Sequence, residues 1–147
     1  MGSLAFTLVE LLVVIAILGT LAGIGMTNYR RMIDKAKTTR AIVDIKNLQT
    51  EIEDYWSDTG SLPAILDDLG IELPLDPWGN PYQYANFDLI PPGKKRKDHF
   101  LVPVNNFYDL YSMGPDGDSK PPFTAGPSRD DIVRANDGGY IGPVAGY

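Results

Sequence analysis

The 147-residue sequence contains no cysteine and only one histidine, His99. Without cysteine, no disulfide can tie the C-terminal part of the chain together, so another device must hold it. A single histidine also cannot form a histidine-pair metal site. Acidic residues outnumber basic ones: the chain has 19 Asp and Glu and 13 Lys and Arg, which gives a formal net charge of −6. This acidic balance argues against nucleic acid as a partner.

Charge is almost absent between Phe6 and Met26, where the sequence reads FTLVELLVVIAILGTLAGIGM. Glu10 is the only ionisable side chain in these 21 residues. As an α-helix the segment would extend about 31 Å, which matches the hydrocarbon core of a bilayer. An isolated carboxylate in such a span costs on the order of 2.5–3.5 kcal/mol, so it usually has a partner and a function. The segment itself contains no basic residue that could be this partner.

Three interpretations of residues 6–26 are open. A secretory signal peptide needs a basic start and an apolar run of about 7–15 residues, whereas residues 1–5 read MGSLA and the apolar run is longer. A plain membrane anchor, with its acid reaching toward the interface, explains the length but not the position of Glu10. In a class III signal, the peptidase cuts before the apolar run, which stays on the mature protein.

The string FTLVE, which begins at Phe6 and is followed by LLVVIAILGTLAG, closely resembles the start of type IV pilins and type II secretion pseudopilins. The resemblance implies cleavage by a prepilin peptidase between Ala5 and Phe6, and N-methylation of Phe6. It also implies a filament of identical subunits, with minor pseudopilins and an inner-membrane assembly platform as partners. The chain has Ala5 and an uncharged leader where the family normally has Gly and basic residues.

Glu10 is the candidate assembly residue. If cleavage frees an ammonium group at Phe6, the N-terminus of a neighbouring subunit can meet Glu10 inside the apolar filament core. The attraction is strong at low dielectric, and a misplaced subunit would leave a buried charge unpaired. We therefore expect this pair to set the register of assembly.

Gly19 is a second candidate assembly residue, because the Gly19-xxx-Gly23 spacing allows two helices to approach closely in a membrane. Together with Gly25, the same glycines weaken the helix by roughly 1 kcal/mol each relative to Ala. Close packing and local unwinding are both open.

An amphipathic pattern continues from Thr27 to Ser57, with apolar residues spaced mainly by three or four positions. These residues are Tyr29, Ile33, Ala36, Ala41, Ile45, Leu48, Ile52, Tyr55 and Trp56. No Pro or Gly interrupts the pattern, so we expect one helix that ends near Ser57. Gly60 and Pro63 are its stop signals.

The remainder predicts short elements separated by turns. Residues 64–69 predict a helical turn, and the segments 82–87, 100–104 and 107–112 predict strands. The string DPWGNPY from Asp76 forms a turn before the first strand and resembles the major pseudopilin of type II secretion. We expect Trp78 and the tyrosines to pack the sheet on the helix. The alternative is an aromatic platform that binds carbohydrate. The basic run KKRK in residues 90–99 predicts a solvated hairpin tip, or a site for an acidic partner.

The strings DLYSMGPDGD, from Asp109, and DDI, from Asp130, resemble two segments that wrap a calcium ion in the same major pseudopilins. The implied ligands are carboxylates of Asp116, Asp130 and Asp131 and backbone carbonyls of Met113, Asp118 and Ser128. Calcium takes six to eight oxygen ligands, which this set can supply. Residues 119–127 make the intervening loop longer than the family usually has. The alternative is an acidic surface loop without a metal.

We therefore predict a pilin-like α+β subunit: a leader at 1–5, a membrane and filament-core helix at 6–26, and an amphipathic helix with a globular head at 27–147. The resemblance implies a non-enzymatic subunit of a type II secretion pseudopilus, anchored in the bacterial inner membrane with its head in the periplasm. The major pilin of an extracellular type IV pilus is the main alternative. A membrane-tethered hydrolase using a metal at Asp116, Asp130 and Asp131 is a remote one.

Overall fold

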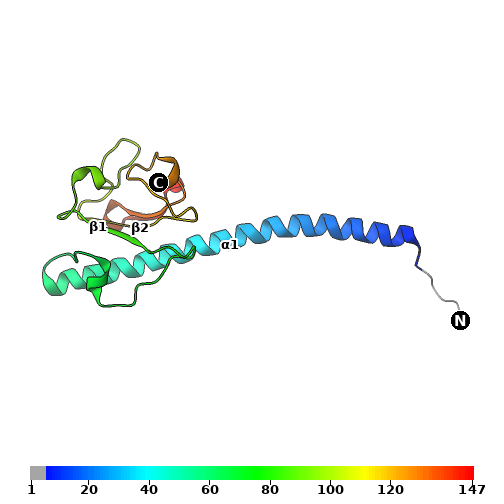
Figure 1. The fold of residues 1–147 in the computed structure, drawn as a ribbon, viewed down its shortest axis with the longest axis horizontal. Helices are drawn as coiled ribbons and strands as arrows, with labels where there is room; N and C mark the ends of the chain where they lie inside the picture. Colours follow the sequence, from blue (N-terminus) through cyan, green and yellow to red (C-terminus); the bar gives the residue numbers. More distant parts are fainter. Residues whose placement is uncertain (1–5) are drawn as a thin grey trace. The chain divides into compact units, whose positions relative to one another are not determined.

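The computed structural model describes residues 6–147, so the leader and the expected cleavage position at Ala5 lie outside the described residues. The chain divides into two compact units, one ending at Ala36 and one comprising Lys37–Tyr147. The second unit is called the head below. Helix α1, Leu8–Thr59, belongs partly to each unit (Figure 1). The expected continuous helix is confirmed, and it ends two residues beyond Ser57.

The first unit consists of the N-terminal part of α1. Among the residues that the structure describes, α1 is the one helix long and apolar enough to cross a membrane, with a mean hydropathy of 2.4 over its most apolar 18 residues. None of that window is buried by the rest of the chain. The helix passes through Gly19, Gly23 and Gly25 without interruption, so local unwinding is not seen in the isolated chain.

Both expected stop signals, Gly60 and Pro63, follow the end of α1 in the head. Gly60 adopts the left-handed conformation, with φ of 77°, and its N–H donates to the carbonyl oxygen of Trp56 at 2.9 Å. This is a common helix ending that favours Gly, and Pro63 follows. The predicted helical turn is present as the 3₁₀ segment η1, Leu66–Leu69. The side chain of Asp68 fixes its start by accepting N–H groups from Ala64 and Ile65.

The sheet has four antiparallel strands in the order β1-β2-β3-β4. They are β1 Gln83–Asn86, β2 Tyr108–Ser112, β3 Ile132–Ala135 and β4 Tyr140–Pro143. The strands predicted at 82–87 and 107–112 are confirmed, whereas the strand predicted at 100–104 is wrong. That segment is a turn, because Asp98 binds its backbone N–H groups and leaves them unavailable to a sheet. Strands β3 and β4 were not predicted.

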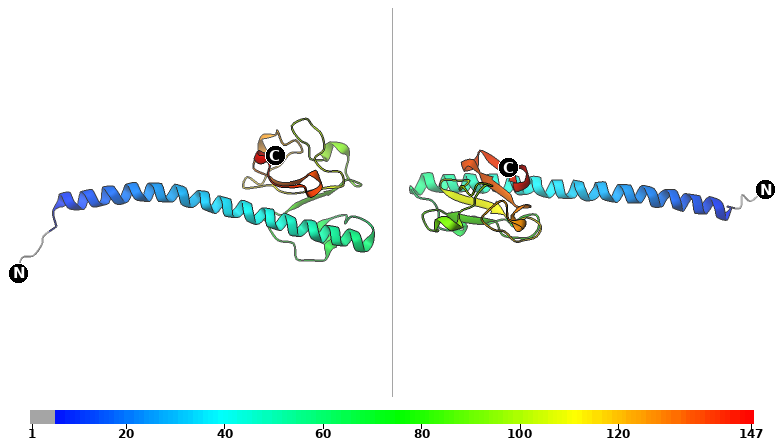
Figure 2. Two further views of the ribbon diagram at one scale, coloured as in Figure 1. Left: turned by 180° about the vertical axis from the view of Figure 1, so that it is seen from behind. Right: turned by 90° about the horizontal axis from the view of Figure 1, so that it is seen from above.

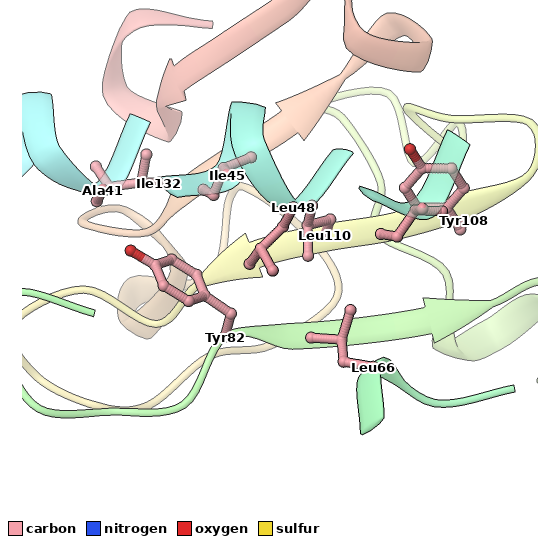
Figure 3. Packing of buried hydrophobic residues seen from close by; sticks show 9 residues of the cluster. Ala41, Ile45, Leu48, Leu66, Tyr82, Tyr108, Leu110 and Ile132 are labelled. Carbon is pink, nitrogen blue, oxygen red and sulfur yellow. The ribbon is translucent and has the colours of Figure 1, made fainter. Parts of the chain in front are cut away.

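One face of the sheet packs on residues 37–59 of α1, as two orthogonal views show (Figure 2). The helix contributes Ala41, Ile45, Leu48 and Ile52, which are almost fully buried and follow the spacing of one helix face. Facing them are Tyr82, Tyr108, Leu110 and Ile132 (Figure 3). Full burial of each of the Ile and Leu side chains contributes about 1.5–3 kcal/mol. The tyrosines therefore pack the sheet on the helix, as predicted, and Trp78 packs against the same cluster.

A second, smaller core lies on the other face of the sheet. Ile132 belongs to the first cluster and Val133 to the second, as expected for adjacent residues of a strand. Val133 is joined there by Val104, Phe123, Ala135 and Val144. This second cluster attaches the C-terminal segment to the sheet without a disulfide. Together the elements confirm the predicted α+β, pilin-like fold.

Candidate assembly and metal sites

Glu10 lies in the first turn of α1 and has a partner within its own chain. Its Oε2 accepts hydrogen bonds from the backbone N–H of Thr7 at 2.9 Å and from the Thr7 hydroxyl at 2.8 Å. In return, Thr7 Oγ1 accepts the N–H of Glu10 at 3.2 Å. This reciprocal arrangement is a capping box, which starts a helix by satisfying N–H groups that lack intrahelical partners. The T-x-x-E spacing from Thr7 to Glu10 is the sequence signal for this cap, which we did not predict.

The other candidate assembly residues are open to a neighbour. Phe6 is 76% exposed, and a Cβ added at Gly19 would meet no atom of this chain within 4 Å. An exposed apolar helix in an isolated subunit must be covered by lipid or by other subunits. The first unit is therefore suited to both environments.

Two of the three residues expected to supply carboxylate ligands, Asp116 and Asp130, are in contact. The turn after β2 brings the N–H of Asp116 to 3.4 Å from Oδ2 of Asp130. Gly114 makes this approach possible: its φ is 67°, and an added Cβ would lie 2.5 Å from the carbonyl oxygen of Asp130. Only glycine fits such a position without displacing the backbone.

Asp131, the third expected carboxylate, points in a different direction. Its Oδ2 forms an ion pair with Nη2 of Arg96 at 2.5 Å and accepts the Ser119 hydroxyl at 2.6 Å. The Asp131 side chain is fully buried, and that of Arg96 is nearly so. Burial raises the pKa of the Asp131 carboxyl, and the Arg96 guanidinium offsets part of that rise. The second oxygen, Oδ1, is buried without a hydrogen-bond partner.

The residues expected to offer backbone carbonyls are spread along the same loop. Met113 directly follows β2 and is half-buried. Asp118 is exposed and donates its N–H to Oδ1 of Asp116 at 2.9 Å. Ser128 is buried, and its hydroxyl donates to the carbonyl oxygen of Lys120 at 2.6 Å. Between residues 6 and 147, no three acidic or histidine side chains gather closely enough to form a ready-made metal site.

The chemistry of the donors nevertheless fits a calcium ion in part. Asp116 is exposed and Asp130 is half-buried, so both carboxylates can be reached by an ion, and Oδ1 of Asp131 is an anionic oxygen without a hydrogen-bond partner. Asp130 is near enough to raise the pKa of Asp131 electrostatically. Buried polar atoms without partners are rare and often mark a bound ion or water. The fit is incomplete because Oδ2 of Asp131 is engaged by Arg96.

Arg96 is the important residue that our sequence analysis missed. It lies within the KKRK run, for which we predicted a solvated tip, yet it is only 3% exposed. Its guanidinium carbon lies 4.1 Å from the ring centre of Tyr111 and 5.3 Å from that of Phe123. Its backbone N–H donates to Oδ2 of Asp109 at 2.7 Å. The prediction is therefore wrong for Arg96, because the aromatic rings and Asp131 come from distant segments that create a buried site for a cation.

Comparison with known proteins places these features in a family. A scan against protein-family models finds no match. The type II secretion system core protein G of Pseudomonas aeruginosa is 33% identical over 133 residues, which cover 76% of this chain and 83% of that protein. The chain belongs to the core protein G family.

Two further core protein G relatives give the same result. The protein from Dickeya chrysanthemi is 32% identical over 76% of this chain and 77% of its own length. The protein from Escherichia coli K12 is 31% identical over 77% of this chain and 82% of its own length. These matches confirm the family resemblance drawn from FTLVE and DPWGNPY, namely to the major pseudopilin of type II secretion.

Proposed function

We propose that this protein is the structural subunit that polymerises through its N-terminal helix into a type II secretion pseudopilus and thereby drives protein export. Membership of the core protein G family is the single observation that carries this function. The exposed apolar helix of the first unit supports this function, because such a helix is stable only in a lipid bilayer or packed against other subunits. The subunit is held in the inner membrane before assembly, with the head in the periplasm. It acts by assembly and not by catalysis.

Three features of the first unit support assembly. The apolar side chains supply contact area, Gly19 permits close approach, and Glu10 offers a charge to the N-terminus of the next subunit. In the isolated chain, the Glu10 carboxylate caps its own helix through Thr7. The two oxygens of a carboxylate can accept several hydrogen bonds. Glu10 can therefore keep its helix cap while it also binds the N-terminal ammonium of a neighbouring subunit. Prepilin peptidase, minor pseudopilins and the assembly platform are the partners that this route requires.

Deletion of the gene in the native bacterium tests the function. We expect exported proteins to accumulate in the periplasm and to disappear from the culture medium, and we expect the wild-type gene to restore export. Normal export together with loss of surface filaments or motility would instead identify the chain as the major pilin of a type IV pilus.

The N-terminus of the mature protein provides a prediction of its own. Because class III processing removes the leader before the apolar run, intact-mass measurement of protein from native membranes should give a chain that begins at Phe6, with one added methyl group. A chain that retains Met1, or one that begins after Gly19, would contradict the assembly route.

We further propose that calcium binds between Asp116 and Asp130, with Oδ1 of Asp131 completing the carboxylate set. Backbone carbonyls of Met113, Asp118 and Ser128 are the remaining candidate ligands. When bound, calcium would neutralise adjacent carboxylates and tie the turn after β2 to the segment before β3. The incomplete fit at Asp131 means that this proposal rests mainly on Asp116 and Asp130.

A melting experiment tests calcium binding. A ligand that binds only the folded state stabilises it by about 2.7 kcal/mol at a hundredfold excess over its Kd. Millimolar calcium should therefore raise the Tm of the chelator-treated full chain in detergent by several degrees, and magnesium should act poorly. The Asp116→Asn/Asp130→Asn variant, which leaves the Arg96–Asp131 pair intact, should not respond. If the wild type has the same Tm with and without calcium, the proposed calcium site is wrong.

A further inference from the structure

The segment Asp98–Pro103, called the finger below, is a closed and ordered loop. Oδ1 of Asp98 accepts the N–H groups of Phe100 at 2.8 Å and Val102 at 2.9 Å. The N–H of Asp98 also donates to the carbonyl oxygen of Val102 at 2.9 Å. Leu101 adopts a positive φ of 62°, which is uncommon for a residue other than glycine. The loop is therefore constrained in one conformation by its own bonds.

The base of the finger is also fixed to the head. The N–H of Lys97 donates to the carbonyl oxygen of Pro121 at 3.0 Å, and the carbonyl oxygen of Lys97 accepts the N–H of Phe123 at 2.9 Å. The preceding residue, Arg96, is held in its buried ion pair. A constrained loop on a fixed base loses little conformational entropy when it binds a partner.

Three large apolar side chains cover the tip of the finger and face solvent. Phe100 is 86% exposed, Leu101 60% and Val102 55%. Three consecutive exposed apolar residues on an ordered loop form a contact surface that water covers poorly. Lys94, also exposed, lies in the basic run that leads into the finger. A partner for this element should therefore offer an apolar groove with acidic side chains at its edge.

The head of this same chain carries such a groove. It has a volume of about 320 Å³ and lies between the loop around η1 and the start of β1. Asp67 and Gln83 line it together with six residues of apolar or aromatic character, namely Ile65, Leu66, Leu73, Pro81, Tyr82 and Tyr84. Asp67 is exposed, and Asp68 and Glu72 adjoin lining residues in sequence. This volume is at the lower end of the range for pockets that hold a small ligand, which suits one or two side chains of a finger.

The finger and the groove lie apart within the head. Figure 1 shows the green segment after the end of α1 beside the helix, whereas the yellow-green loops before β2 lie on the far side of the sheet. A finger thus cannot fill the groove of its own subunit. When two different patches of one protein are complementary, identical copies join head to tail, and such contacts form a ring if the rotation closes and an open helical filament if it does not.

We propose that the finger of one subunit inserts into the groove of a second copy of this chain within the pseudopilus. Phe100 and Val102 would fill the apolar lining, and Lys94 would approach Asp67 at the edge. This inference rests on the proposed function, because it requires the filament. It assigns a contact between heads, in addition to the contacts made by the N-terminal helices.

Cysteine cross-linking tests the contact directly, since the natural chain has no cysteine. Two differently tagged full-length copies, one with Val102→Cys and one with Ile65→Cys, are co-expressed with the assembly machinery. Sheared filaments are then treated with an oxidant or a short bismaleimide. We expect a product that carries both tags. The control pairs Ile65→Cys with Leu89→Cys, because Leu89 is an exposed apolar residue outside the finger, and we expect it to give little product.

The outcomes separate this inference from the proposed function. The finger contact would be overturned if filaments gave no Val102–Ile65 product, or if the Leu89 control gave an equal amount of product. Either result would not affect the proposed function as a pseudopilus subunit. Absence of filaments from the wild-type protein would overturn both. In a second test, Phe100→Ser/Val102→Ser should lower the yield of sheared filaments several-fold with an unchanged monomer Tm, whereas Leu89→Ser should leave both unchanged. Wild-type filament yield from the finger variant would also overturn the contact.

Discussion

Replacing Glu10 with Gln is expected to abolish filament formation and to leave the subunit folded and inserted in the membrane. Gln can still form the capping box with Thr7, because a carboxamide oxygen accepts the same N–H group. It cannot supply the negative charge that the N-terminal ammonium of a neighbouring subunit requires. Removal of one partner from a buried ion pair typically costs 3–5 kcal/mol, roughly two to four orders of magnitude in the association constant of each subunit.

The Glu10→Ala variant is the matched control for this prediction, since it removes both the cap and the charge. Filament yield after shearing, measured alongside the Tm of the head and the amount of membrane-inserted protein, separates the two roles. If charge is decisive, both variants fail to assemble to a similar extent. Wild-type assembly by Glu10→Gln together with failure of Glu10→Ala would show that the helix cap, and not the intersubunit charge, is what assembly needs.

Replacing Arg96 with Met is expected to be the most destabilising single change in the head. The substitution keeps most of the apolar stem but leaves the Asp131 carboxylate buried without its cation. Breaking a buried pair from one side costs about 3–5 kcal/mol. The Tm of the full chain in detergent should therefore fall by roughly 10 °C or more, by the usual scaling for a domain of this size. Limited proteolysis should then cut within residues 119–127, which Ser119 connects to the pair.

The double variant Arg96→Met/Asp131→Leu is the control. Removing both partners eliminates the buried charge, and apolar replacements of a buried ion pair are often close to neutral. We expect it to recover much of the lost Tm, with a coupling free energy above 1 kcal/mol in the double-mutant cycle. Additive effects of the two substitutions would mean that Arg96 stabilises the head only through its stacking on Tyr111 and Phe123.

Local patterns predicted the parts of the fold that depend on nearby residues. The three- and four-residue spacing from Ala41 to Ile52 predicts the buried helix face, and Gly60 with Pro63 predicts its end. Tyr82 directly precedes β1 and Tyr108 begins β2, and both pack on the helix as expected. These elements are determined by periodicity and by backbone stereochemistry, which a single sequence displays.

The features that could not be predicted depend on distant segments. Arg96 looks like its three lysine neighbours until Asp131, Tyr111 and Phe123 are brought around it. The segment 100–104 has the composition of a strand, yet Asp98 closes it into a turn by binding its backbone. Strand β3 contains Arg134, whose buried side chain bonds Gln49 of the helix, so its pattern is not the simple alternation of a half-buried strand. The assignment of calcium ligands similarly depended on family resemblance and not on spacing.

Electron cryo-microscopy of filaments sheared from cells that express this chain with its secretion machinery tests the central claim most directly. The account predicts a helical polymer of this subunit with the helices of the first unit at its centre, and with the N-terminus of each Phe6 beside Glu10 of a neighbour. Cells that contain only dispersed, membrane-embedded subunits while export proceeds normally would contradict it.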